Sequence, residues 1–138
     1  MGELQGTALQ RFERLVALQF NYPLSAWKTI FEFADKTLSQ AGLDHTMLCH
    51  AGNGLILINL LPTPKGGDDK ALVNAARTLL AECRKAGGNL VVQRAPADLK
   101  KALPIWGEPG SDLDLMKRIR VELDPSGVMN PGRSAVGL

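Results

Sequence analysis

The residues of this chain best suited to chemistry near neutral pH are two histidines and two cysteines. His45, Cys49 and His50 lie close together in the sequence, and Cys83 lies far from them. On an extended strand Cys49 and His50 face opposite sides, whereas His45 and Cys49 share a side but offer a metal ion only two ligands. Catalysis by a metal bound to these three residues is therefore the weakest of the functions considered. Neither cysteine belongs to a C-x-x-C pair, which favours two buried thiols.

These groups need a scaffold, and the hydrophobic pattern predicts its first half. Residues 11–20 alternate as a strand does, and Pro23 stops that strand. A helix is expected over 24–41, with Ser25 as its N-cap. Strands are expected over 44–49 and 55–61, joined by a hairpin at residues 50–54 in which Asn53 and Gly54 take positive φ. The expected helix places four large side chains in the core: Trp27, Ile30, Phe31 and Leu38.

The second half repeats the order. Asp68 or Asp69 caps a helix that Gly87-Gly88 ends, and residues 89–94 form a fourth strand. The inward stripe of this helix is Leu72, Ala75, Ala76, Leu79, Leu80 and Cys83. Strand, helix, strand, strand, helix, strand is the order of an α+β, ferredoxin-like antiparallel sheet with two helices on one face. The other face is left for another role.

A C-terminal helical tail follows the sheet. Residues 96–102 form a helical turn, and residues 104–111 form a loop that carries Trp106. Asp112 is expected to cap a last helix that turns Leu115, Met116, Ile119 and Leu123 inward. Two tight turns then end the chain, and their prolines predict extended backbone at Asp124 and Asn130.

Length and composition narrow the classes of protein. With 138 residues and a formal net charge of +2, the chain is the size of one domain and has too little excess charge to attract nucleic acid by itself. We expect a loose N-terminus over 1–10 and a single domain over 11–138. No apolar run is long enough for a membrane span.

The tail carries a resemblance to a known family. L-M-K-R-I-R-V-E-L-D-P-S-G-V-M-N-P-G-R, residues 115–133, resembles the C-terminal signature of the FAD-linked oxidases, which include D-lactate and glycolate dehydrogenases. Residues 50–54 resemble the family's H-x-G-(D/N)-G segment, and Gly87-Gly88 resembles the pair that opens its last strand. The resemblance covers about residues 12–133 and corresponds to the cap, or substrate, domain. It implies a fragment of a longer protein, in which an absent domain binds most of the FAD. Gly66-Gly67-Asp68 is the nearest candidate for a phosphate-binding loop, and its carboxylates make it a poor one.

The resemblance also implies that reactive groups have been lost. Family dehydrogenases bind a divalent metal through two His and one Glu. Here the first His is His50, the second is replaced by Leu57 and the Glu by Gln93, while Arg94 stands where the family has a further His. We therefore expect neither a metal site nor a catalytic residue in this chain, which by itself should be inactive.

Four residues remain as candidates for binding. His50 is either satisfied by backbone groups or contacts substrate or flavin. Arg94 is either solvated or binds a substrate carboxylate, for which guanidinium is suited. Asn59 is a strand-face residue or a substrate contact, and Asn130 serves the turn or lies near FAD. Trp106 either fills the core or packs on the missing flavin domain, and His45 is expected at the surface.

Within the family, the sequence is most similar to the accessory FAD-binding subunit of glycolate oxidase. That likeness implies oxidation of a small 2-hydroxy acid, glycolate to glyoxylate. It also implies three protein partners: the FAD-binding domain of the same protein, a catalytic flavoprotein subunit and an iron–sulfur subunit. The location would be cytoplasmic, with membrane association through the complex. The alternative is a non-enzymatic ferredoxin-like module for ligand binding or interaction.

Overall fold

The structure, a computed structural model, describes residues 14–61, 69–107 and 110–132. The chain divides into two compact units, Met1–Gly107 and Glu108–Leu138. We call them the first and the second unit and describe each by itself.

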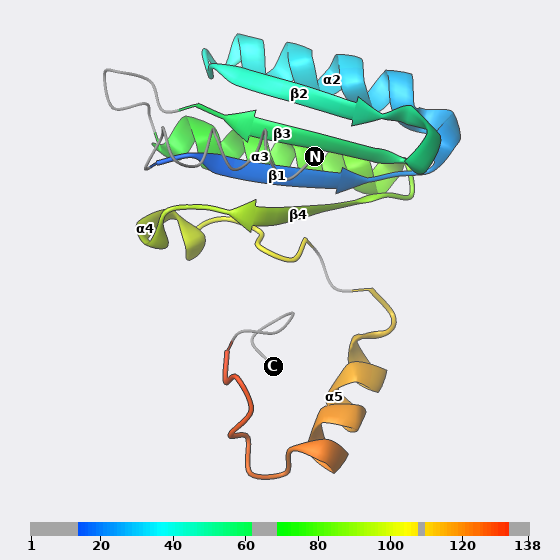
Figure 1. The fold of residues 1–138 in the computed structure, drawn as a ribbon, viewed down its shortest axis with the longest axis vertical. Coiled ribbons are helices and arrows are strands. Elements are labelled where there is room, and N and C mark those ends of the chain that lie inside the picture. Colours follow the sequence, from blue (N-terminus) through cyan, green and yellow to red (C-terminus); the bar gives the residue numbers. More distant parts are fainter. Residues whose placement is uncertain (1–13, 62–68, 108–109, 133–138) are drawn as a thin grey trace. The chain divides into compact units, whose positions relative to one another are not determined.

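The first unit is built on one four-stranded antiparallel sheet in the order β2-β3-β1-β4. Its strands are β1 (Val16–Asn21), β2 (His45–His50), β3 (Leu55–Leu60) and β4 (Asn89–Arg94). The helices α2 (Trp27–Gln40) and α3 (Asp69–Lys85) lie on the same face of the sheet (Figure 1). The short helix α4 (Ala97–Lys100) follows β4. This β-α-β-β-α-β order confirms the predicted ferredoxin-like α+β fold.

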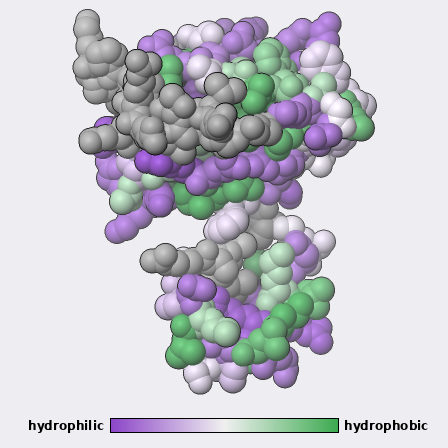
Figure 2. Space-filling model, viewed as in Figure 1, coloured by the Kyte–Doolittle hydropathy of each residue, from purple (hydrophilic) through white to green (hydrophobic). Residues whose placement is uncertain are grey.

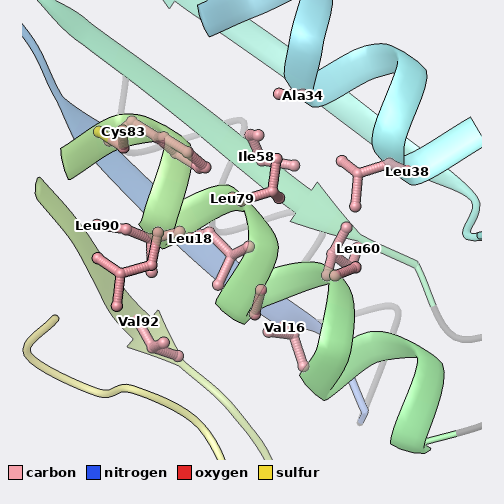
Figure 3. Close-up of a cluster of buried hydrophobic side chains, with 14 of the residues drawn as sticks. Val16, Leu18, Ala34, Leu38, Ile58, Leu60, Leu79, Cys83, Leu90 and Val92 are labelled. Atoms are coloured by element: carbon pink, nitrogen blue, oxygen red, sulfur yellow. The ribbon is translucent and has the colours of Figure 1, made fainter. Parts of the chain in front are cut away.

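The core lies between that face and the two helices. Val16, Leu18 and Phe20 of β1 point into it and are almost completely buried. Leu79 of α3 and Leu38 of α2 reach toward the sheet from the helices (Figure 3). Alternation along each strand sends every second side chain into this layer. The predicted stripe of α3 is confirmed, since all of it is buried except Leu72, which is partly buried.

The prediction for α2 was wrong at its start. A short 3-10 helix, η1 (Leu24–Ala26), comes first, and α2 begins after Ala26, without a side-chain cap from Ser25. Trp27 was expected in the core but is 42% exposed. The buried stripe of α2 is Ile30, Ala34 and Leu38, so the helix meets the sheet only after its first turn. Phe31 is partly buried.

The limits of β1 and the form of the hairpin also differ from expectation. β1 starts at Val16, because its pairing with β3 runs from Val16 opposite Leu60 to Asn21 opposite Leu55; residues 11–13 lie outside the described residues. The hairpin is a 3-10 turn, η2 (Ala51–Asn53), closed by Gly54 at φ +63°, and Asn53 does not take positive φ. A Cβ at Gly54 would lie 2.2 Å from the Tyr22 carbonyl oxygen.

The second unit contains α5 (Leu113–Leu123). Asp112 precedes the helix but makes no side-chain cap hydrogen bond. The side chains that we expected to turn inward are exposed, from 44% at Met116 to 75% at Leu123. Hydrophobic surface is visible on this unit in Figure 2. The expectation that these side chains turn inward was therefore wrong for the described residues 110–132, none of which covers them.

Gly88 brings α3 and β4 against β1. Gly87 ends α3 at φ +77°, and the Gly88 N–H then donates to the Cys83 carbonyl at 2.8 Å. A Cβ on Gly88 would lie 2.4 Å from the Asn21 carbonyl oxygen and 2.7 Å from the Cys83 sulfur. This close approach explains the glycine pair.

We predict that Gly88→Ala destabilises the first unit by about 1–3 kcal/mol, because the added methyl group must push backbone and a buried thiol apart. Gly52→Ala is the matched control, since a Cβ there meets nothing within 4 Å. Urea unfolding followed by circular dichroism measures both. Equal stabilities of the two variants would contradict the packing role of Gly88.

Candidate functional site

The candidate site is the face of the sheet opposite α2 and α3, which we call the second face. Ala17, Gln19 and Asn21 alternate with the core residues of β1 and therefore point toward this face. Strand pairing adds residues of β2, β3 and β4 to it, in three cross-strand rows. In the order β2-β3-β1-β4 these rows are Thr46-Asn59-Ala17-Arg94, Leu48-Leu57-Gln19-Val91 and His50-Leu55-Asn21-Asn89.

The rows bring two of the predicted binding residues together. Asn59 and Arg94 both pair with Ala17, so they flank β1 at one end of the second face. Two strand spacings put their backbones about 10 Å apart. A long guanidinium side chain can span most of that gap. Asn59 also donates through Nδ2 to the Thr46 hydroxyl at 3.4 Å.

His50 lies at the opposite corner of the same face. Its row is four residues away from the row of Arg94, which is about 13 Å along the strands, and it is also three strands away. A two-carbon acid is too short to contact both side chains. The sequence predicted His50 and Arg94 as binding residues alike, and only the strand register shows how far apart they lie.

A chain of side-chain amides crosses the second face between these corners. The Gln93 amide N–H donates to Gln19 Oε1, and the Gln19 amide N–H donates to Asn21 Oδ1 at 3.1 Å. Gln93 reaches this position because the pairing of β1 with β4 shifts register between Ala17 and Leu18. Gln93 was identified from the sequence as the replacement of a metal-binding Glu, whereas Gln19 had no predicted role. The sequence did contain a signal for Gln19, because it is a polar residue that alternates with the apolar core residues of β1.

His50 has a buried ring nitrogen. It is the last residue of β2, just before η2, and its Nε2 atom has no hydrogen-bond partner among the described residues. A buried nitrogen without a partner is costly and invites a ligand or an ordered water. No described backbone group satisfies this atom, so the backbone-satisfied interpretation is not supported at Nε2.

His45 was expected at the surface, and that expectation was wrong. Its side chain is only 12% exposed. The ring lies 2.8 Å from the Leu43 carbonyl oxygen through Nδ1 and 3.1 Å from the Asp35 carboxylate through Nε2. Both nitrogens are engaged, so His45 fastens the start of β2 to α2 and has no free nitrogen for catalysis.

The two thiols are free but differ in burial. Cys83 is buried, as expected, and donates toward the carbonyls of Asn21 and Asn89. Burial raises the pKa of the Cys83 thiol to about 11. Cys49 is only half-buried, contrary to expectation, and its sulfur lies 3.4 Å from the Tyr22 hydroxyl. Burial, followed by the contact with Cys49, raises the pKa of Tyr22 far above its usual value.

Asp124 organises the turns of the second unit. Its carboxylate accepts the backbone N–H groups of Val128 and Met129, each at 2.9 Å, and lies 3.7 Å from the Arg120 guanidinium. Arg120 also donates to the Met129 carbonyl at 3.2 Å. The Met129 N–H is the largest cause that lowers the pKa of Asp124, and Arg120 adds to it.

Asn130 departs from the extended backbone predicted for a residue before proline. It has φ +43° and is the one non-glycine residue with positive φ among the described ranges. Asparagine tolerates this left-handed region better than most residues. Asp124, before the other proline, has φ −138° and is extended in φ as expected. Asn130 is therefore explained by turn geometry, and a role near flavin stays a prediction.

A comparison with known protein families shows the family of this chain. The family described as "FAD linked oxidases, C-terminal domain" matches residues 13–134, which span both units. The chain belongs to this family. No curated protein matches the chain in a direct sequence comparison.

An FAD-linked oxidase C-terminal domain implies FAD, whose pyrophosphate needs a cradle in the protein. Such a cradle needs backbone N–H groups free of negative charge, usually at a helix N-terminus. α3 begins with Asp69, and α5 begins beside Asp112 and Asp114. These helix ends do not fit a pyrophosphate. The loop Gly66-Gly67-Asp68 lies outside the described residues.

Two other features of this FAD-linked oxidase domain concern metals and membranes. No group of three or more His, Cys, Asp or Glu side chains that could hold a metal occurs within 14–61, 69–107 and 110–132. Of the helices described, none has the length and apolar character to cross a bilayer.

Trp106 is 47% exposed, so it does not fill the core.

We predict that alkylation separates the two thiols. Cys49 should react with iodoacetamide at neutral pH well before Cys83, because Cys83 is buried and its raised pKa leaves little thiolate. Mass spectrometry of peptides from the folded protein measures both rates, and denatured protein is the control in which the rates should converge. Similar rates in the folded protein would contradict the burial of Cys83.

We predict that acid opens the Asp124 turn. The carboxylate stabilises the turn fully above the ordinary aspartate pKa of about 3.9, and this contribution is lost as pH falls through the lower pKa of the folded chain. The amide proton shifts of Val128 and Met129 should follow that titration in NMR spectra. Asp124→Asn should remove the titration and speed amide exchange at both residues. Unchanged exchange in the variant would show that Asp124 does not hold the turn.

Proposed function

We propose that this domain forms the substrate side of an FAD-dependent 2-hydroxy-acid oxidoreductase, and that the acid is glycolate, which is oxidised to glyoxylate. Membership of the FAD-linked oxidase family supports the general chemistry. The likeness of the sequence to the accessory FAD-binding subunit of glycolate oxidase supports the choice of acid.

The observation that carries this proposal is the make-up of the second face. Where family dehydrogenases place metal ligands, this face has Leu57 and Gln93, and Gln93 is tied to Gln19. Arg94 is exposed on the neighbouring position. A guanidinium binds a carboxylate in a bidentate manner and keeps its charge at neutral pH. In our proposal, Arg94 replaces metal coordination as the means of holding the acid.

Asn59 and His50 take separate parts in this proposal. Asn59 flanks β1 opposite Arg94 and is assigned to the polar end of the substrate. His50 is too far away to share a two-carbon acid with Arg94, so its buried Nε2 is assigned to the flavin side of the site. Asn130, in the exposed turn of the second unit, is assigned to FAD.

The flavin itself is assigned to another domain. We infer that the FAD-binding domain belongs to the same protein, and that the protein works with a catalytic flavoprotein subunit and an iron–sulfur subunit. The exposed stripe of α5 supports docking against such a domain, because an amphipathic helix needs a partner for its apolar side. Exposed Trp106 is a second anchor of this kind. The assembly would lie in the cytoplasm and associate with the membrane through its partners.

Arg94→Ala should raise the KM for glycolate by roughly 10- to 100-fold, because a charge-assisted hydrogen bond is lost. The enzyme reconstituted with its FAD-binding domain is used, and steady-state kinetics compare glycolate with ethylene glycol, which lacks the carboxylate. Arg94→Lys is the control that keeps the charge and should recover part of the loss.

Two outcomes would reject the proposal. If Arg94→Ala left the KM for glycolate unchanged, Arg94 would not bind the substrate carboxylate. A flavin spectrum and glycolate turnover from the 138-residue chain alone would show that FAD does not come from another domain.

A further inference from the structure

The two edges of the sheet in the first unit are finished differently. At the β4 edge, the Val92 N–H donates to the Ile105 carbonyl at 2.8 Å, so the segment after α4 continues the hydrogen bonding. The register shift of the sheet also lies on the β4 side. β2 is the other end strand, and it pairs with β3 without any irregularity. The β2 edge therefore has neither a bulge nor a described strand beside it.

β2 also lacks the side chains that usually protect an edge strand. Natural edges carry lysine, proline or inward-pointing charges that prevent another strand from adding. β2 reads His-Thr-Met-Leu-Cys-His, with no lysine, arginine, carboxylate or proline. Leu48, on the second face, is 41% exposed. An uncharged, regular edge with an exposed leucine is a surface on which a further strand can pair.

The two ends of β2 differ in a way that suggests what pairs there. Near its C-terminal end, η1 and η2 are in contact, and Leu24 and Trp27 are 56% and 42% exposed. Figure 2 shows hydrophobic surface at this hairpin end of the sheet. Near its N-terminal end lies a hollow of about 380 Å³, lined by Ser39, Gly42, Leu43, Asp44 and His45. One end of the edge thus carries exposed apolar side chains, and the other end is hollowed.

We propose that β2 is an interface at which a second copy of this chain adds, antiparallel, to extend the sheet. Paired residues of antiparallel strands share a face, so the two-fold axis is perpendicular to the sheet and lies midway between one residue of β2 and the same residue of the second copy. An axis at Leu48 pairs Leu48 with its copy, Met47 with Cys49, and Thr46 with His50. This register covers the exposed leucine with the same side chain of the second copy.

The same register brings the exposed Leu24 and Trp27 side chains of one copy to the hollow of the other. In an antiparallel pair, the C-terminal end of one β2 lies beside the N-terminal end of the other. Trp27 and Leu24 of each copy then lie level with the hollow of the other copy. The Trp27 indole N–H is a donor, and Asp44 supplies an acceptor in that hollow. Because each copy carries both parts, the contact closes as a symmetric dimer, which favours a second copy over an unrelated extended segment.

Disulfide trapping tests this register directly. Leu48→Cys, in a Cys49→Ser background, should form a disulfide-linked dimer under mild oxidation, since paired positions lie within the roughly 7 Å that a disulfide can span. Thr46→Cys in the same background is the matched control. Its two copies would be about 13 Å apart along the strands and should stay uncrosslinked. Crosslinking of both variants to the same extent, or of neither, would overturn the proposal.

Analytical ultracentrifugation tests the association itself. The unmodified chain should show a concentration-dependent dimer, and Leu48→Lys should shift it to monomer while leaving the circular dichroism spectrum unchanged. Val121→Lys, a like change at an exposed position of α5, should leave the dimer intact. A chain that stays monomeric at all concentrations would overturn the proposal and would leave the edge to a different extended partner. A dimer that Val121→Lys disrupts and Leu48→Lys does not would assign self-association to α5 instead.

Discussion

The burial of one face of the sheet under α2 and α3 is the constraint on which the rest of the first unit depends. Once Val16, Leu18 and Phe20 enter that layer, the residues between them must point the other way. The end of α3 and the start of β4 can approach β1 closely because Gly88 has no Cβ that would meet the Asn21 carbonyl. The second face is therefore a consequence of core packing, and its chemistry is set by whichever residues occupy the alternate positions.

The side chains at those positions set the electrostatic character of the second face. Its centre is an amide chain, Gln93 to Gln19 to Asn21, and none of these groups changes charge with pH. Arg94 at one end supplies a permanent positive charge, and His50 at the other end supplies a buried nitrogen. A face of this kind can hold and orient an anion. This fits a domain that works beside a flavin domain, as its family implies.

The second unit solves a different physical problem. Its turns are held locally, because the Asp124 carboxylate satisfies the N–H groups of Val128 and Met129. The hydrophobic side of α5, by contrast, has no cover among the described residues of its own unit. A turn can be stabilised by a few hydrogen bonds within one short segment, but an apolar stripe requires a second layer. Within residues 110–132, hydrogen bonds therefore hold the turns, while the apolar side of α5 is exposed.

Much of the fold could be predicted from the sequence, because alternation and helical periodicity are local signals. β4 lies within the predicted limits, and the inward stripe of α3 was identified correctly. The family was also readable, since the signature from Leu115 to Arg133 is one continuous segment. Such signals depend only on residues that are close in the sequence, so they can be recognised without knowing which elements pack together.

Only the tertiary structure decided burial, side-chain contacts and strand register, because these depend on segments that are distant in the sequence. Trp27 fits the stripe of α2 but lies before the point at which the helix meets the sheet, so it is exposed. His45 links β2 to α2 because its Nε2 atom lies 3.1 Å from the Asp35 carboxylate, which is ten residues away in the sequence. The separation of His50 from Arg94 follows from strand register, and register is a property of pairing between distant segments. The sequence by itself therefore determined the elements, their order and the family, whereas burial, register and the spacing of the site arose from packing.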